Sequence, residues 1–177
     1  TVAALALASE AAGAPLDRLI AALPGFRGTK RRQELVGIRR GIHVYDDFAH
    51  HPTAVRETLA GFRERVDGRL IAVFEPRSAT ASRRLHQDDY PAAFEAADIT
   101  VLAPVGRSEI ASEERLDIHA IAEAVRTAGG EAIACSTVDE VVERALRTAR
   151  PGDTIVVMSN GRFDDASDRI LLGLGRA

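Results

Sequence analysis

Apolar residues recur along this chain in two different rhythms. Four short, nearly continuous apolar runs predict buried strands, at Leu70–Phe74, Ile99–Leu102, Ala132–Cys135 and Thr154–Met158. Elsewhere apolar residues recur three and four positions apart, a spacing typical of helices with one buried face. These helical stripes are Val55, Leu59, Phe62 and Val66; Ile118, Ile121, Ala122 and Val125; and Val138, Val141, Val142, Ala145 and Leu146. Strands that alternate with helices build a parallel sheet covered on both faces.

Local signals refine this pattern. Thr137-x-x-Glu140 is the sequence of a capping box and marks the start of the third helix, and Ser167–Leu174 is predicted as the last helix. Glu34–Arg39 and Ile42–Tyr45 are extended in character, and the two residues between them predict a tight hairpin. His86, Asp88 and Asp89 are assigned to the surface of a helix.

The amino-terminal part differs from the rest. Residues 1–23 are rich in Ala and Leu and are interrupted by Gly13-Ala14-Pro15, which predicts two short helices. Because the chain opens inside an apolar helical run, we expect residues 1–23 to be the tail of a preceding domain and residues 24–177 to form a second domain. The predicted fold class is therefore α/β: a Rossmann-like, mostly parallel sheet with helices on both faces, preceded by a short helical segment and a hairpin.

Composition narrows the classes of function. A formal net charge of −3 gives no basis for a nucleic-acid-binding surface or a polybasic membrane contact. No apolar stretch approaches the roughly 20 residues of a membrane helix, and no secretory signal pattern is visible. The single cysteine, Cys135, excludes an internal disulfide framework, and its apolar neighbours predict a buried side chain. We expect a cytoplasmic protein with neither nucleic acid nor membrane as a partner.

Three polar loops follow predicted strands, at Asp46–Pro52, Glu75–Thr80 and Ser159–Asp165. Ligands of such sheets bind at the carboxyl ends of the strands, so we expect the functional site to be built from these loops.

The first loop carries the densest group of ionisable residues. Two carboxylates, Asp46 and Asp47, and two imidazoles, His50 and His51, precede a helix that has Pro52 in the favoured first position. Free N–H groups and the helix dipole make such an end an anion site, and a carboxylate beside it can accept hydrogen bonds from sugar hydroxyls. One alternative is that Asp46 and His51 only cap the turn and the helix. Another is a metal site of Asp47, His50 and His51, for which no ligand from a third element is visible.

The other loops offer simpler chemistry. Arg77 directly follows a strand, and a guanidinium can grip a carboxylate with two bonds, although it could equally pair with Glu75. Ser159-Asn160-Gly161 is a small-residue loop that would let a ligand approach the backbone, or it is a plain turn. Lys30-Arg31-Arg32 could reach phosphates or could be an ordinary charged loop.

The string Tyr45-Asp-Asp-Phe-Ala-His-His-Pro-Thr53 is similar to the signature of the third domain of Mur ligases. These ATP-dependent enzymes build or recycle the peptide stem of the bacterial cell wall. With Glu75-Pro-Arg-Ser78 and Val157-Met-Ser-Asn-Gly161, the chain resembles the tripeptide-recycling members more than the L-alanine-adding ones, which have Tyr and Gly in place of Phe48 and Ala49.

The resemblance implies a ligase of three domains, of which this chain holds the last. Residues 1–23 would end the central ATPase domain, which would bind most of the ATP and Mg²⁺. The substrates would be UDP-N-acetylmuramate and the tripeptide L-alanyl-γ-D-glutamyl-meso-diaminopimelate, joined through an acyl phosphate. We expect the isolated chain to fold without catalysing ligation. The alternatives are the same domain of an L-alanine-adding ligase and a nucleotide-binding module without catalysis.

The resemblance also implies roles for single residues. Asp47 would hold the ATP ribose, with Asp46 nearby and Arg32, in an Arg-x-Glu arrangement, on the nucleotide. His50 and His51 would lie near the phosphates or the acyl phosphate. The incoming peptide would be bound by Arg77, Ser78, Thr80, Ser159 and Asn160. The sequence departs from the family at Ala79, Ser82 and Arg162–Asp165, where relatives have Asn, a Lys-containing string and a Gly-rich tail.

Overall fold

A computed structural model describes residues 2–22, 25, 29–106 and 110–176 of the chain. They fall into two compact units, Thr1–Lys30 and Arg31–Ala177. The domain boundary expected from the sequence lies at residues 23 and 24, which are outside the described residues. The assignment of residues 1–23 to a preceding domain therefore stays a prediction.

The first unit contains two short helices, α1 (Val2–Ala12) and α2 (Leu16–Ala22). Gly13 ends α1 in the left-handed conformation, with φ of 62°. Its N–H donates to the carbonyl of Glu10, and the next N–H, of Ala14, donates to Ser9 over 3.1 Å. This is a Schellman motif, which explains why the helix stops at this glycine.

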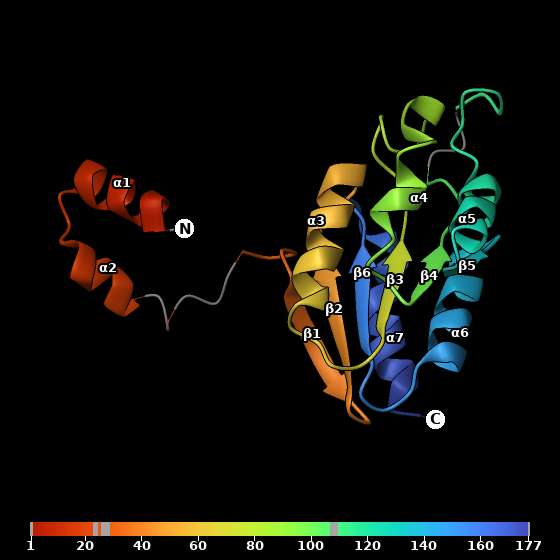
Figure 1. Ribbon diagram of the computed structural model, residues 1–177. Helices are drawn as coiled ribbons and strands as arrows, with labels where there is room; N and C mark the ends of the chain where they lie inside the picture. Colours follow the sequence, from red (N-terminus) through yellow and green to blue (C-terminus); the bar gives the residue numbers. More distant parts are fainter. Residues whose placement is uncertain (1, 23–24, 26–28, 107–109, 177) are drawn as a thin grey trace. The chain divides into compact units, whose positions relative to one another are not determined.

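The second unit is built on one sheet of six strands (Figure 1). The strands are β1 (Glu34–Arg39), β2 (Ile42–Asp47), β3 (Leu70–Phe74), β4 (Ile99–Leu102), β5 (Glu131–Ala134) and β6 (Thr154–Met158), in the order β1-β2-β6-β3-β4-β5. All neighbours are parallel except β1 and β2, which form the predicted hairpin. Its turn residues, Arg40 and Gly41, have φ of 52° and 74°, as a two-residue hairpin turn requires.

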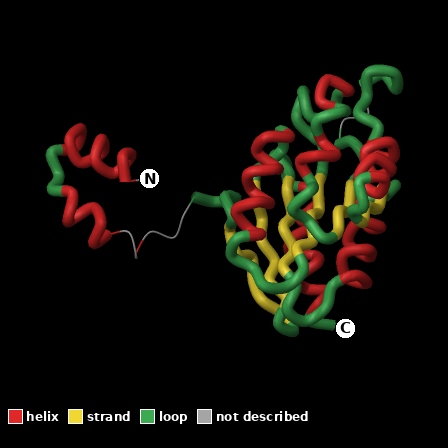
Figure 2. Tube along the Cα trace, viewed as in Figure 1, coloured by secondary structure: helices red, strands yellow, loops and turns green. Residues whose placement is uncertain are grey.

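Helices cover both faces of this sheet, as the sequence predicts (Figure 2). Successive residues of β3 alternate between two cores, so that Leu70, Ala72 and Phe74 lie in one and Ile71 and Val73 in the other. The first core receives side chains from α3 (Pro52–Arg63), α4 (Tyr90–Ala93) and α5 (Ile118–Thr127). The second receives them from α6 (Val138–Thr148) and α7 (Ala166–Leu174).

Side-chain caps fix where the longer helices begin. Asp117 accepts hydrogen bonds from the N–H groups of His119 and Ala120, each over 3.0 Å, at the start of α5. At α6, Thr137 accepts from the N–H of Glu140 as predicted. The Glu140 carboxylate reaches back one residue further than a capping box requires, to the N–H of Ser136.

The segment between β3 and β4 differs from the sequence prediction. His86 ends a single 3₁₀ turn, η2 (Arg84–His86), and Asp88 and Asp89 lie in the turn that leads to the four-residue helix α4. The assignment to a helix surface was therefore wrong for Asp88 and Asp89, whereas His86 does lie in a short 3₁₀ helix. Within the described ranges, no helix is long and apolar enough to cross a membrane.

The Cys135 side chain is fully buried, and burial raises its pKa to about 11. Since the thiolate is the reactive form, roughly one thiol in a thousand would be ionised at pH 8. We therefore predict that 5,5′-dithiobis(2-nitrobenzoate) reacts far more slowly with the native chain than with the chain unfolded in urea. Equal rates in the two states would contradict this burial.

Candidate functional site

The three polar loops meet because their strands are neighbours. β6 lies between β2 and β3, and Asp47, Met158 and Phe74 occupy the same level of the sheet. Backbone hydrogen bonds continue just beyond the strand ends. The N–H of Ser159 donates to the carbonyl of Asp47, and the N–H of Glu75 donates to the carbonyl of Met158. The candidate site is therefore the carboxyl edge of these three central strands.

Asp47 is buried at this edge, and its carboxylate is bonded within the chain. One oxygen accepts from the N–H of Gln33 over 2.8 Å, and the other from the N–H of Ala49 over 2.8 Å and the hydroxyl of Thr58 over 3.4 Å. These contacts tie the segment before β1 to β2 and α3. Asp47 therefore shapes the site whether or not it also binds a ligand.

Asp46 is held by Arg31. The guanidinium lies 3.1 Å from the Asp46 carboxylate, donates to the carbonyl of Ser159 over 2.5 Å and lies over the ring of Phe48. Burial raises the pKa of Asp46 above its ordinary value, against the opposing effect of Arg31. Arg31 thus links the first and third loops, a role that the sequence analysis did not assign, whereas Arg32, the predicted nucleotide contact, is exposed.

The two histidines differ in environment. His51 is the N-cap of α3, and its Nδ1 accepts from the N–H of Thr53 over 3.4 Å. The capping alternative is thus present in the structure, and Nε2 of His51 has no hydrogen-bond partner within the described parts of the chain. His50 is half-buried, with Nδ1 2.9 Å from the carbonyl of Phe48. Both imidazoles lie beside the first turn of a twelve-residue helix, where an anion is stabilised.

Arg77 and Ser159 meet on a buried carboxylate. One oxygen of Glu75 accepts from Arg77 over 3.3 Å, and the other accepts from the hydroxyl of Ser159 over 2.5 Å. The Ser159 hydroxyl in turn accepts from the N–H of Gly161. A side chain at Gly161 would clash with Arg77, so this glycine lets the guanidinium cross the third loop. Arg77 still has 44% of its side chain exposed.

The remaining predicted contacts border this network. The Ser78 hydroxyl accepts from the N–H of Ala81 over 3.0 Å and lies 3.3 Å from the hydroxyl of Thr80. Both hydroxyls therefore belong to one turn beside Arg77. The Oδ1 atom of Asn160 is buried and has no hydrogen-bond partner among the residues that the structure describes. A buried acceptor without a donor is costly, and a ligand N–H would satisfy it.

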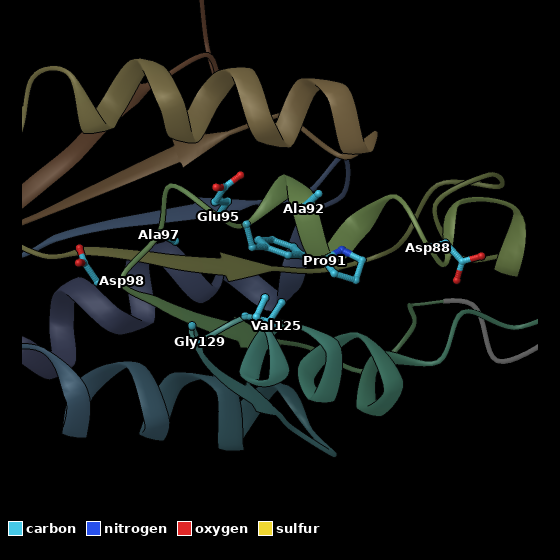
Figure 3. A pocket seen from close by; sticks show the side chains of 11 residues that line it. Asp88, Pro91, Ala92, Glu95, Ala97, Asp98, Val125 and Gly129 are labelled. Carbon is cyan, nitrogen blue, oxygen red and sulfur yellow. The ribbon is translucent and has the colours of Figure 1, made fainter.

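Two other features of the described residues bear on the site. No group of three or more His, Cys, Asp and Glu side chains in these parts of the chain could hold a metal ion. A groove of about 700 Å³ runs between α4 and α5, past Phe94 and Val125 (Figure 3). It reaches Asp98 and Gly130, which directly precede β4 and β5, so it extends toward the opposite end of the strands.

A family model for the Mur ligase, glutamate ligase domain, matches residues 31–161. This chain belongs to the Mur ligase family. Mur ligases are ATP-dependent, amide-forming ligases, and the match covers the hairpin, the sheet, the first two loops and the first three residues of the third loop.

Relatives agree with the assignment. The chain is 39% identical to the UDP-N-acetylmuramate–L-alanyl-γ-D-glutamyl-meso-2,6-diaminoheptandioate ligase of Escherichia coli K12. This alignment covers 98% of the chain and 36% of the relative. The chain is also 34% identical, over 88% of its length and 32% of the relative, to the UDP-N-acetylmuramate–L-alanine ligase of Symbiobacterium thermophilum. The crystal structure of a murein peptide ligase from Psychrobacter arcticus superimposes with a TM-score of 0.72 and 39% identity, over 89% of this chain and 32% of that one. The chain spans about a third of the length of the curated relatives it matches.

Asp47→Ala should destabilise the Mur ligase domain by about 1.5–3 kcal/mol, the range for hydrogen bonds to a charged group. Urea unfolding of the 177-residue chain measures this. Asp67→Ala removes an exposed carboxylate and should change the free energy of unfolding by less than about 0.5 kcal/mol. If the two variants were equally stable, the Asp47 contacts would not hold the loop.

Proposed function

We propose that this chain is the C-terminal domain of a ligase that joins UDP-N-acetylmuramate to L-alanyl-γ-D-glutamyl-meso-diaminopimelate in the recycling of peptidoglycan. The observation that carries the proposal is the 39% identity to a ligase of that name, which extends over 98% of the chain. The three loop motifs through which the chain resembles such ligases lie on adjacent strands, where one pair of ligands could contact all of them.

The reaction proposed for the whole enzyme has two steps. ATP transfers its γ-phosphoryl group to the lactyl carboxylate of the sugar, which gives an acyl phosphate and ADP. The amine of the tripeptide then attacks the acyl carbon, inorganic phosphate leaves, and the amine loses a proton. Mg²⁺ would be bound mostly by the preceding ATPase domain. The proposed location is the cytoplasm, where ATP is available.

The nucleotide is assigned to the first loop. Asp47 would accept a hydrogen bond from the ribose through lone pairs that its backbone contacts leave available, with Asp46 beside it. Arg32 is exposed and lies in the segment before β1, which the bond from the Gln33 N–H to Asp47 fixes to the first loop. Its side chain can therefore extend toward phosphates. His50 and His51 would contact the phosphates or the acyl phosphate at the start of α3.

The incoming peptide is assigned to the second and third loops. Arg77 would bind a carboxylate of the glutamyl or diaminopimelyl part while it remains anchored by Glu75. Ser78, Thr80, Ser159 and Asn160 surround it, and the unpartnered Oδ1 of Asn160 supports a ligand with an N–H group at this place. One loop for the nucleotide and two for the peptide agree with a reaction between a nucleotide-activated sugar and a peptide.

The second candidate is a ligase that adds L-alanine, because several relatives 32–35% identical to the chain carry that name. Tripeptide and L-alanine should be compared as acceptors for the full-length ligase. We predict a kcat/KM about ten- to hundredfold higher for tripeptide, since one added contact to a charged group contributes about 1.5–3 kcal/mol. A preference for L-alanine would support the second candidate, and ligation of neither would refute the proposed function.

Arg77 tests the peptide side of the proposal. Arg77→Lys keeps the charge but loses the two-bond grip, so it should raise the KM for tripeptide without changing that for ATP, and Arg77→Ala should raise it further. Arg147→Ala is the matched control, because Arg147 also forms an exposed pair, with Glu143 on α6. Exposed ion pairs contribute only about 0–1 kcal/mol. A KM for tripeptide near the wild-type value in all three variants would show that Arg77 is an ordinary surface residue.

A further inference from the structure

The ring of His51 is packed against a second imidazole that comes from another part of the chain. The rings of His51 and His86 meet edge to face, with centroids 4.5 Å apart and planes at 71°. His86 ends the 3₁₀ turn η2, thirty-five positions along the chain, and only 20% of its side chain is exposed. An aromatic pair of this geometry restricts the orientation of both rings.

A carboxylate holds His86 from its other side. Nδ1 of His86 lies 3.1 Å from Oδ2 of Asp89. An ionised carboxylate can only accept, so this contact places the proton of His86 on Nδ1 and fixes the plane of the ring. Asp89, His86 and His51 thus form a chain of contacts that ends at the first turn of α3.

The segment that supplies Asp89 and His86 is anchored in the core. Tyr90 is fully buried, and its hydroxyl donates to the carbonyl of His50 over 2.7 Å. Its ring packs against Phe74 and Phe94, with centroids 5.2 and 6.3 Å away. The turn before α4 is therefore fixed to the same loop twice, once through a backbone carbonyl and once through the His51 ring.

These contacts define what His51 can present to a ligand. Because its Nδ1 accepts from the N–H of Thr53, the ring proton lies on Nε2, which makes that atom a donor. The side chain borders a cavity of about 270 Å³ whose charged lining residues are Arg56, Asp88 and Asp89. Rotation of the ring would lose both the cap of α3 and the packing on His86.

We propose that His86, oriented by Asp89, is a positioning residue that holds the His51 imidazole with Nε2–H available to the anion bound at the start of α3. The inference rests on the proposed function, in which His51 contacts the phosphates or acyl phosphate. His86 acts through His51 and contacts neither substrate.

The test is a double-mutant cycle in the full-length ligase. His51→Ala should lower kcat about a hundredfold, as for the loss of one donor to developing negative charge. His86→Ala should lower kcat about two- to tenfold, with unchanged KM values, because an aromatic pair is lost. His86→Phe keeps the ring packing but loses the bond to Asp89, so it should recover only part of that loss. In the His51→Ala background, His86→Ala should have no further effect.

Leu85→Ala is the matched control, because Leu85 lies in the same 3₁₀ turn and is 71% exposed. It should leave kcat unchanged. An equal loss in this variant, an additive loss in the double mutant, or no effect of His51→Ala on kcat would overturn the inference while ligation itself continued.

A readout without turnover separates the inference from the proposed function. The ring ¹⁵N chemical shifts of His51 should show the Nε2–H form in the wild-type protein and a mixture of forms in His86→Ala. An unchanged His51 spectrum in that variant would overturn the inference even if no acceptor were ligated.

Discussion

The site depends on one feature of the sheet: β6 lies between β2 and β3, in parallel and in register. Three loops that are far apart in the sequence therefore leave the sheet side by side. Close packing at the other end of the strands helps to keep this register. A side chain at Gly68, just before β3, would clash with the carbonyl of Gly152, just before β6, so only glycine fits there. The exchange of backbone hydrogen bonds between β2, β6 and β3 positions all the groups at the edge.

Two buried carboxylates then fix the loops above the strands. Asp47 joins the segment before β1 to α3, and Glu75 joins the second loop to the third through Ser159 while it also holds Arg77 of its own loop. Each carboxylate is bonded by the chain itself, which compensates for its burial. Arg77 is thereby held in place while part of its side chain stays exposed. His51 is held separately, by the N–H of Thr53 and the ring of His86. Because Asp47 has a structural role in these contacts, a variant at Asp47 must be judged by both stability and kinetics.

Much of the fold could be predicted from the sequence because its signals are strong. Continuous apolar runs locate β3, β4 and β6 as observed, and β5 within one residue. The order of the strands could not be predicted, since it depends on how helices pack across the sheet.

Helix α4 was missed because four residues are too few to show a helical period. The contacts of Arg31 were missed because a run of basic residues does not reveal which one turns inward. The packing of His51 on His86 was missed because the two residues are distant in the sequence. The three left-handed residues Phe163, Asp164 and Asp165 were not predicted either. Asp adopts positive φ more often than most residues, but no glycine marks this segment.

The central claim is that ligands bind at the carboxyl edge of β2, β6 and β3. Hydrogen–deuterium exchange of the full-length ligase, with and without a non-hydrolysable ATP analogue and tripeptide, tests it most directly. The account predicts that the analogue slows exchange in residues 46–53, and that tripeptide adds protection in residues 75–80 and 159–161. Protection confined to the groove between α4 and α5, with these three loops unchanged, would contradict it.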